Sequence, residues 1–541
     1  MARTPLPRFV GWILIAPAAV LFLLTYVWPT LSLLGESLFG SGGGQAWADP
    51  GRAWQHVFSL RYFGRLGYAL SYALLPILVI ATVAPALAWA ASRAGLVWRR
   101  AVRVLLAVPL AAFAPAGLAL LWTERHRPAG GSLASLAEAS INWDGRLVLM
   151  ATMGAFVLAV AVVCYLAAFR DGTGRGTGST VVVVGVLLSI VALGFAVQQY
   201  TFPDLVDGAP GNRASGVRGT PMLRLGMGDF NAQVAAEAVP VVAVLAVLGL
   251  AAAFVVLRTG LRLEFDPTDG ADDRPAPAGP PKAAVIGSAA GVAGLLLLIV
   301  FQLGPWLVEV ATGVQWPQTN FPGLAVLLST WLIPLGAALV QVVVAAAAAF
   351  GIAVVRPLGR RSEWLLLVVA PWLLVGNGLL QLPRVSPGGE PTLLTILAAA
   401  VPASWISIPA LFLFTMLFRA QADRWMRSRS ARQPNAFLRA MWPALPMAVS
   451  AVGVTWLMQA QDLLVSTMAD AGNGVVAHAQ LLMARKAAHG LSTVEPALGY
   501  PLVMLVLFTV GALVLQLTYL DRIAVRIGGG ENPPSREQLP R

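Results

Sequence analysis

Several polar side chains lie inside long apolar runs of this sequence, where their burial is costly. Asp462 is the clearest acidic residue among them, and Asn377 and Gln381 are spaced to share one face of a helix. Such side chains could line a membrane path for a hydrophilic solute. They could equally join helices by hydrogen bonds or lie near lipid headgroups, and both interpretations stay open. The candidates are Asp462, Gln459, Gln461, Asn377, Gln381, Gln198 and Gln199, with Gln341 as a further polar residue.

The sequence does not contain the residue patterns of common catalytic sites. A phosphate-binding P-loop needs Gly-Lys-Ser/Thr, and neither Lys282 nor Lys486 has that context. Gly-x-Ser-x-Gly is missing, and the one cysteine, Cys164, lies in an apolar run that predicts a core thiol. We expect no catalytic residue, no metal site and no cofactor on this chain. The histidines lack metal-ligand spacing and are expected in solvated loops: His56, His126, His478 and His489.

The segment Arg419–Pro446 is a basic, polar island between two long apolar runs. On the cytoplasmic side of a membrane, such a loop could receive a soluble protein partner. A cluster of arginines could also bind anionic lipid headgroups. The net charge of +12 does not indicate nucleic-acid binding, because a membrane protein with basic cytoplasmic loops has the same excess.

The elements that position these residues are predicted to be membrane-spanning helices. The chain has 541 residues, of which 57% are hydrophobic and only 11% are charged, and the charges fall between apolar runs. A run of about 20 apolar residues is long enough to cross a bilayer as a helix. We predict twelve spans, at about 10–34, 66–92, 104–123, 147–169, 180–199, 235–257, 283–308, 323–355, 364–383, 392–418, 441–468 and 497–519.

Charge and spacing predict how the spans are arranged. With the N-terminus in the cytoplasm, roughly two-thirds of the lysines and arginines fall in cytoplasmic segments, which favours cytoplasmic N- and C-termini. Six spans return the chain to its starting side, so two six-helix halves would be parallel repeats. The predicted units are a first half, 1–258, a cytoplasmic linker rich in Pro, Gly and Asp, 259–282, and a second half, 283–541.

Sequence landmarks support the repeat. The first half contains Ser71–Pro76, then Arg99-Arg100, then Leu105–Pro109. The second half contains Ser329–Pro334, Arg360-Arg361 and Leu366–Pro371 in the same order and at nearly equal spacing. One shared Leu-Pro pair would be chance, whereas three ordered landmarks suggest a duplicated or fused ancestor.

With these stretches in view, the chain resembles the permease subunits of binding-protein-dependent ABC importers, of the maltose-permease-like carbohydrate type. The resemblance rests on Ser71–Trp122, Ser329–Pro371 and Trp456–Leu464, and covers most of both halves. It implies a bacterial plasma-membrane protein with two fused permease halves. It also implies cytoplasmic ATPase subunits, which would hold ATP and Mg²⁺, and an extracytoplasmic solute-binding protein.

The coupling loops depart from the family pattern. Family members carry Glu-Ala-Ala, then Gly, then an aliphatic-Leu-Pro sequence in each half, and this loop docks on the ATPase. Here the first-half loop is only Arg170–Ser179, too short for two helices. In the second half, Phe437–Pro443 fits the end of the motif, but the acidic position holds arginine. The resemblance places coupling at Arg424, Trp425, Met426, Ser430, Phe437 and Pro443.

Three functions therefore remain open at the level of sequence. The first is an ATPase-driven importer permease coupled asymmetrically through the second-half loop. The second is an uncoupled pseudo-permease that serves as a structural or regulatory membrane partner. The third is a secondary transporter with twelve helices in two parallel halves. Few charges lie within the spans to couple ions, which argues against the third.

Overall fold

The structure is a computed structural model that describes residues 6–40, 50–125, 145–170, 177–203, 205, 220–222, 231–265, 280–312, 327–384, 401–470 and 499–528. The predictions for His126, His478 and His489 lie outside these residues. Most of the chain described is helical, as the apolar runs predict.

In the first predicted half, the described helices run from α1 to α14. A π-helical turn, Leu23–Val27, joins α1 to α2 into one long apolar helix. The described helices are α1 (Arg8–Phe22), α2 (Trp28–Phe39), α3 (Pro50–Val57), α4 (Leu60–Ser71), α5 (Leu74–Ala81), α6 (Val83–Arg93), α7 (Leu96–Ala111), α8 (Pro115–Arg125), α10 (Gly145–Phe169), α11 (Thr177–Val197) and α14 (Ala232–Thr259).

The second predicted half begins with α15 and ends in a short strand. Its third segment is irregular, made of short helical turns at Gly359–Trp364, Ala370–Trp372 and Leu382–Arg384 between short helices. The described helices are α15 (Lys282–Gln302), α16 (Gly304–Thr312), α18 (Ile333–Phe350), α19 (Leu365–Val369), α20 (Asn377–Gln381), α22 (Ile408–Ser430), α23 (Ala436–Met441), α24 (Ala444–Ala460), α25 (Leu463–Asp470) and α27 (Leu502–Thr518).

The protein is a mainly helical, multi-pass membrane protein. Within the part of the chain that the structure describes, nine helices are long and apolar enough to cross a membrane, and a bent pair, α7 with α8, would make a tenth. The predicted spans 364–383 and 392–418 are not among them. The first is broken into short helices, and α22 begins only at Ile408 and then continues into the charged residues up to Ser430.

Two helix breaks, one between α7 and α8 and one before α20, each have a local cause. The axes of α7 and α8 meet at 85° across Ala112–Ala114, directly before Pro115, which has no N–H to continue the helix. In the second half, Gly376 is extended between Trp372 and α20. Glycine weakens a helix and proline interrupts its hydrogen bonds, so the apolar composition that predicted one span does not hold the segment in one piece.

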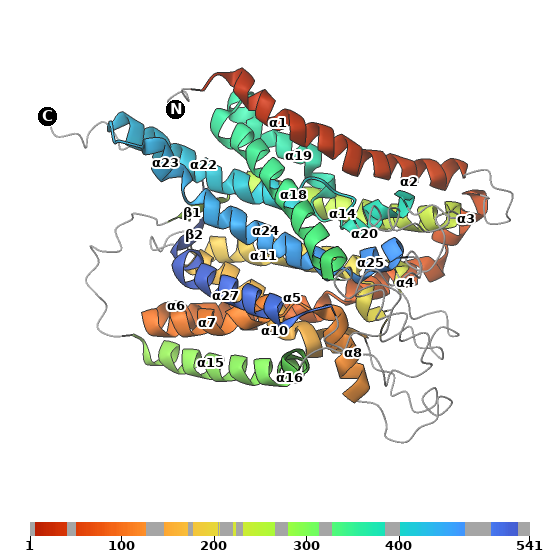
Figure 1. The fold of residues 1–541 in the computed structure, drawn as a ribbon, viewed down its shortest axis with the longest axis horizontal. Coiled ribbons are helices and arrows are strands. Elements are labelled where there is room, and N and C mark those ends of the chain that lie inside the picture. Colours follow the sequence, from red (N-terminus) through yellow and green to blue (C-terminus); the bar gives the residue numbers. More distant parts are fainter. Residues whose placement is uncertain are drawn as a thin grey trace.

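Most of the long helices run roughly along one direction, and the two predicted halves are interleaved (Figure 1). α1 packs against α18, and α15 packs against α6 and α7, so the first helix of each half contacts the other half. α14 packs against the broken segment at Ala370–Trp372, and α27 packs against α7. The last long helix of each half therefore contacts the third segment of the other.

Two short strands join the halves at one end of the helices. β1 (Arg262–Phe265) follows α14, and β2 (Ile523–Arg526) follows α27. They pair antiparallel, with Arg262 opposite Arg526 and Phe265 opposite Ile523. β1 lies at the start of the predicted linker 259–282, so that part of the linker is not irregular. Figure 1 places both strands at the same end as the beginning of α1 and as α23, on the left.

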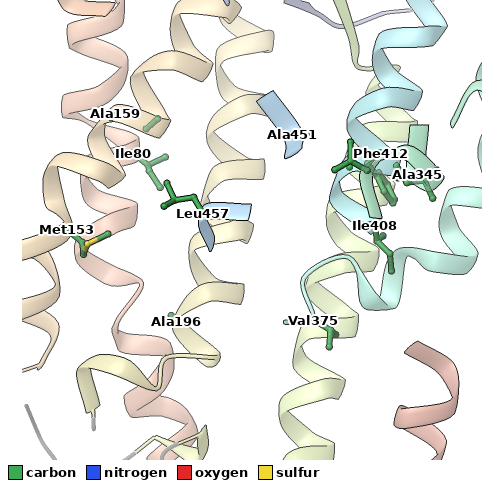
Figure 2. Close-up of a cluster of buried hydrophobic side chains, with 14 of the residues drawn as sticks. Ile80, Met153, Ala159, Ala196, Ala345, Val375, Ile408, Phe412, Ala451 and Leu457 are labelled. Carbon is green, nitrogen blue, oxygen red and sulfur yellow. The ribbon is translucent and has the colours of Figure 1, made fainter. Parts of the chain in front are cut away.

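Small and aliphatic side chains fill the interior. Figure 2 draws one group, Ala345, Ile408 and Phe412, on α18 and α22, and another, Ile80, Met153 and Ala159, on α5 and α10. α18 packs on α22, and α10 packs on α5. Many of the buried residues are alanines, which let helix backbones approach closely and give van der Waals contact where lipid supplies no hydrophobic drive for helix association.

Candidate functional site

A chain of hydrogen bonds, here called the polar chain, runs through the second half, with the buried Gln341 and Ser404 at its centre. Asn377 accepts from the Ser404 hydroxyl at 2.6 Å. Gln341 donates from Nε2 to the Ser404 carbonyl at 2.7 Å, and its Oε1 accepts from Gln459 Nε2 at 2.8 Å. The four side chains come from α20, the segment before α22, α18 and α24. The structure thus joins two of the predicted candidates, Asn377 and Gln459, through Gln341 and Ser404.

Two buried polar atoms, in or beside the polar chain, have no hydrogen-bond partner among the described residues. Gln341 is 1% exposed, and Gln461 is 3% exposed. Among the described residues, Gln459 Oε1 and Gln461 Nε2 have no hydrogen-bond partner. One acceptor and one donor are therefore buried close in sequence beside the chain, and buried polar groups without a partner carry a free-energy cost unless a water or solute supplies one.

The irregular segment before α22 explains why polar side chains gather here. Ser407 caps α22 by accepting from the Ala410 N–H, and the residues before it are not helical. Their backbone groups are satisfied by side chains: the Tyr26 hydroxyl donates to the Ile406 carbonyl at 2.9 Å, and Gln341 holds Ser404. Non-helical backbone at membrane depth is tolerated only where protein buries it or where it lines a water-filled cavity.

Gln198 lies beside this chain rather than within it. Its Nε2 donates to the Leu374 carbonyl at 2.7 Å, and its Oε1 accepts from the Gly376 N–H at 2.6 Å. A side chain at the end of α11, in the first half, therefore satisfies the helix break directly before Asn377. Gln199 does not join it: its described hydrogen bonds are through its backbone, including its carbonyl to Thr220. Gln381 is buried at the end of α20.

Asp462 has a structural role in this conformation. Its carboxylate accepts from the Val465 N–H at 3.2 Å, and its carbonyl accepts from Ser466, so it caps the start of α25. An N-cap aspartate satisfies a helix N–H that has no intrahelical partner. The side chain is half-buried. The carboxylate is therefore explained by capping, and its predicted place in a solute path needs a test that separates charge from cap.

Two substitutions at Asp462 separate the effect of its charge from its effect as a helix cap. Asparagine caps a helix about as well as aspartate, whereas alanine loses about 1 kcal/mol. We expect Asp462→Asn to keep both stability and uptake if the carboxylate only caps α25, and Asp462→Ala to lower both. Solute uptake and melting temperature measured on the two variants decide the role. Lost uptake with unchanged stability in Asp462→Asn would instead place the charge in the solute path.

The predicted coupling loop is a helical elbow, which we define as residues 424–443. Trp425 is buried at the end of α22 and stacks edge-on against Phe437 of α23 at 5.3 Å. Phe437 also packs on Phe350 of α18 at 6.2 Å. The Pro443 carbonyl accepts from the Tyr519 hydroxyl. These contacts fix the elbow to the body of the protein.

The exposed surface of the elbow is basic and apolar. Arg424 and Met426 are half-buried, and Ser430 is exposed, with its hydroxyl bonded to the Arg427 carbonyl. Trp442 is 66% exposed and Leu438 is 65% exposed. The exposed arginines are Arg427, Arg429, Arg432 and Arg439. Of the six residues predicted to couple, Trp425 and Pro443 are thus buried and act as supports.

The segment that joins α10 to α11 in the first half is short. α10 ends at Phe169 and α11 begins at Thr177, so only seven residues separate them. This spacing agrees with the short first-half loop, Arg170–Ser179, of the sequence analysis.

Sequence reasoning missed a buried carboxylate. Glu237, on α14, is 1% exposed and lies 3.3 Å from His56 Nε2, while Gln233 donates to its Oε1 at 3.1 Å. The prediction that His56 is a solvated loop residue is wrong, because α3 packs it against α14. An acidic residue in the predicted span 235–257 was the available signal. The contact to α3, 181 positions away in sequence, was not visible.

Sequence reasoning also missed a charged cluster near the strands. Asp521 pairs with Arg99 Nε at 2.9 Å and with Arg103 Nε at 3.0 Å. Arg103 is 1% exposed and also donates to Gln516 Oε1 at 2.9 Å.

Within the residues described, groups of three or more His, Cys, Asp or Glu side chains that could hold a metal ion were not found. The chain matches no protein-family model, no curated protein and no solved structure.

Proposed function

We propose that the chain is the membrane permease of a binding-protein-dependent ABC importer, with two six-helix permease halves fused in one polypeptide. In this proposal, separate cytoplasmic ATPase subunits hold ATP and Mg²⁺, and this chain is not an enzyme. An extracytoplasmic binding protein delivers a sugar or similar polar solute. The protein lies in the bacterial plasma membrane with both termini in the cytoplasm.

Reciprocal packing is the observation that carries the proposal. α1 contacts α18 while α15 contacts α6, and α14 contacts Ala370–Trp372 while α27 contacts α7. Each of these two contacts has its counterpart in the other half, as expected of two equivalent halves around a two-fold axis. The antiparallel pairing of β1 with β2 obeys the same symmetry. Two such halves enclose a path between them, which suits alternating access.

The polar chain, which lies on elements of the second half, supports a solute path. Broken helices in transporters place backbone and polar side chains at the solute site, and Asn377 lies directly after such a break. Gln459 and Gln461 offer one acceptor and one donor without partners in the described residues. Amide groups exchange hydrogen bonds with hydroxyl or amide groups of an uncharged solute.

A specific observation favours the alternative of an uncoupled pseudo-permease. The segment that joins α10 to α11 in the first half is short, and the second half presents arginines where the family has a glutamate. A scaffold that no longer meets an ATPase would keep its interleaved helices and lose the docking residues. A secondary transporter is less favoured, because the polar chain from Asn377 to Gln459 consists of uncharged side chains, with no acid or base to couple ions.

Purification of the tagged protein in mild detergent tests the proposal. A P-loop ATPase in fixed stoichiometry, with hydrolysis stimulated by a binding protein and its solute, would support the importer. Protein that purifies without an ATPase, from cells that express one, would favour the uncoupled membrane partner.

Charge reversal on the elbow gives a second prediction. We expect Arg427→Glu, Arg429→Glu and Arg432→Glu together to abolish co-purification of the ATPase, because like charges replace a complementary pair at the contact. The control reverses three other exposed arginines near the strands, Arg100, Arg258 and Arg522. An ATPase that stays bound to the elbow variant would rule out the elbow as its docking site.

A further inference from the structure

The eight residues Tyr519–Arg526, here called the clasp segment, belong to the second half by sequence but bond to the first. β2 pairs with β1, which continues α14. Asp521 pairs with Arg99 and Arg103 of α7, and the Leu520 carbonyl accepts from Arg103 at 3.3 Å. The clasp segment is therefore attached to two separate elements of the first half.

Tyr519 connects the clasp segment to the elbow. Its hydroxyl donates to the Pro443 carbonyl, at the point where the elbow enters α24. Its ring stacks on Phe265 of β1, with centroids 5.2 Å apart and planes 22° apart. The side chain is 3% exposed. One buried residue thus contacts the elbow with its hydroxyl and the first half with its ring.

The strands also contact the helices that would carry coupling loops. β1, which continues α14 of the first half, packs against α22, which leads into the elbow. β2, from the second half, packs against α10, whose own following loop is only seven residues long. Packed contacts therefore connect the elbow, through Tyr519 and the strands, to α10, α7 and α14.

We propose that Tyr519 is the positioning residue through which the single elbow moves the first half. The inference rests on the proposed function, because it explains how an importer with one coupling loop could move both halves. When the partner displaces the elbow, Tyr519 moves with it and displaces Phe265 and the paired strands. The ion pairs of Asp521 then displace α7. The shortened first-half loop is then not needed for coupling.

The first test measures the mechanical link without any partner. Tyr519→Phe keeps the ring stack and removes only the hydroxyl bond to Pro443. We expect hydrogen–deuterium exchange to rise about 5- to 10-fold at amides of both the elbow and β1, because losing one buried hydrogen bond changes a local opening equilibrium by about this factor. Faster exchange in the elbow alone, or in neither segment, would overturn the link.

Tyr500→Phe is the matched control. Tyr500 is 1% exposed, and its hydroxyl also donates to a backbone carbonyl of the first half, that of Ala111. It lies just before α27, whereas the clasp segment follows that helix. We expect its loss to destabilise the protein to a similar degree while exchange in the elbow and β1 stays at the wild-type rate. An equal rise in both variants would mean general loosening and would contradict a specific role for Tyr519.

The second test uses the protein with its ATPase in proteoliposomes. We expect Tyr519→Phe to keep ATP hydrolysis within about twofold and to lower solute uptake per ATP several-fold, because the elbow would still dock but would move the first half less. Unchanged uptake per ATP would overturn the inference. Failure of any ATPase to bind the wild-type chain would contradict the proposed function, whereas the exchange experiment judges the link by itself.

Discussion

Asp521→Ala is expected to destabilise the protein by about 3–5 kcal/mol, because it removes the counter-ion of a buried arginine. Arg103 is 1% exposed, and Asp521 lies 3.0 Å from its Nε. A buried charge without a partner costs much more than the pair contributes. We expect a fall of several degrees in the apparent melting temperature in detergent, read from the loss of the monodisperse peak after heating.

Glu363→Ala is the control for this prediction. Glu363 pairs with Arg419 at 3.0 Å and Arg356 at 3.6 Å, but these arginines are 25% and 21% exposed at their side chains. Because solvent still reaches both arginines, this variant should lose less stability than Asp521→Ala. If both variants lost the same stability, burial of Arg103 would not be the cause of the Asp521 effect.

Under the proposed function, Gln341→Leu is expected to stop solute uptake, and it should destabilise the protein by about 2–5 kcal/mol. Leucine has nearly the volume of glutamine but cannot donate to the Ser404 carbonyl or accept from Gln459, which are 2.7 Å and 2.8 Å away. Each buried group left without a partner costs about 1–3 kcal/mol. The segment before α22 loses its support, and the polar chain is cut at its centre. Uptake is measured per molecule of folded protein in the membrane.

Gln302→Leu is the control that distinguishes loss of the solute path from loss of stability. Gln302 of α15 also makes two hydrogen bonds to another helix, donating to the Met150 carbonyl at 2.9 Å and accepting from the Ala155 N–H at 2.8 Å. It is not part of the polar chain. We expect a stability loss of the same kind with uptake per folded molecule retained. Full uptake by Gln341→Leu would remove the polar chain from the solute path.

The sequence was sufficient for the helical class and most helix positions, because an apolar run of about 20 residues has few structural options in a bilayer. It was not sufficient for the third segment of the second half. There Pro371 and Gly376 interrupt an apolar run that, by its composition alone, predicts one span. The break became clear only from its partners, since Gln198, 178 residues away, satisfies the Gly376 N–H.

The candidate site could be predicted only in part. Polar residues in apolar runs pointed to Asn377 and Gln459, but not to their connection through Gln341 and Ser404, which depends on the rotation of α18 and α24. Asp462 was singled out for its charge, whereas its position before α25 gives it a capping role. The elbow was found by its length and basic residues, but sequence could not tell that Trp425 and Pro443 face inward.

The pairing of Arg103 with the clasp segment also has a consequence for biosynthesis. The Leu520 carbonyl, which accepts from Arg103, lies 417 residues later in the chain. A ribosome adding about 5–20 residues per second needs roughly 20–80 s to make that stretch. During this interval the arginine of α7 has neither Asp521 nor Gln516 and must keep its charge hydrated at the membrane surface. A nascent chain therefore carries this arginine without these partners until Gln516 and Asp521 have been synthesised.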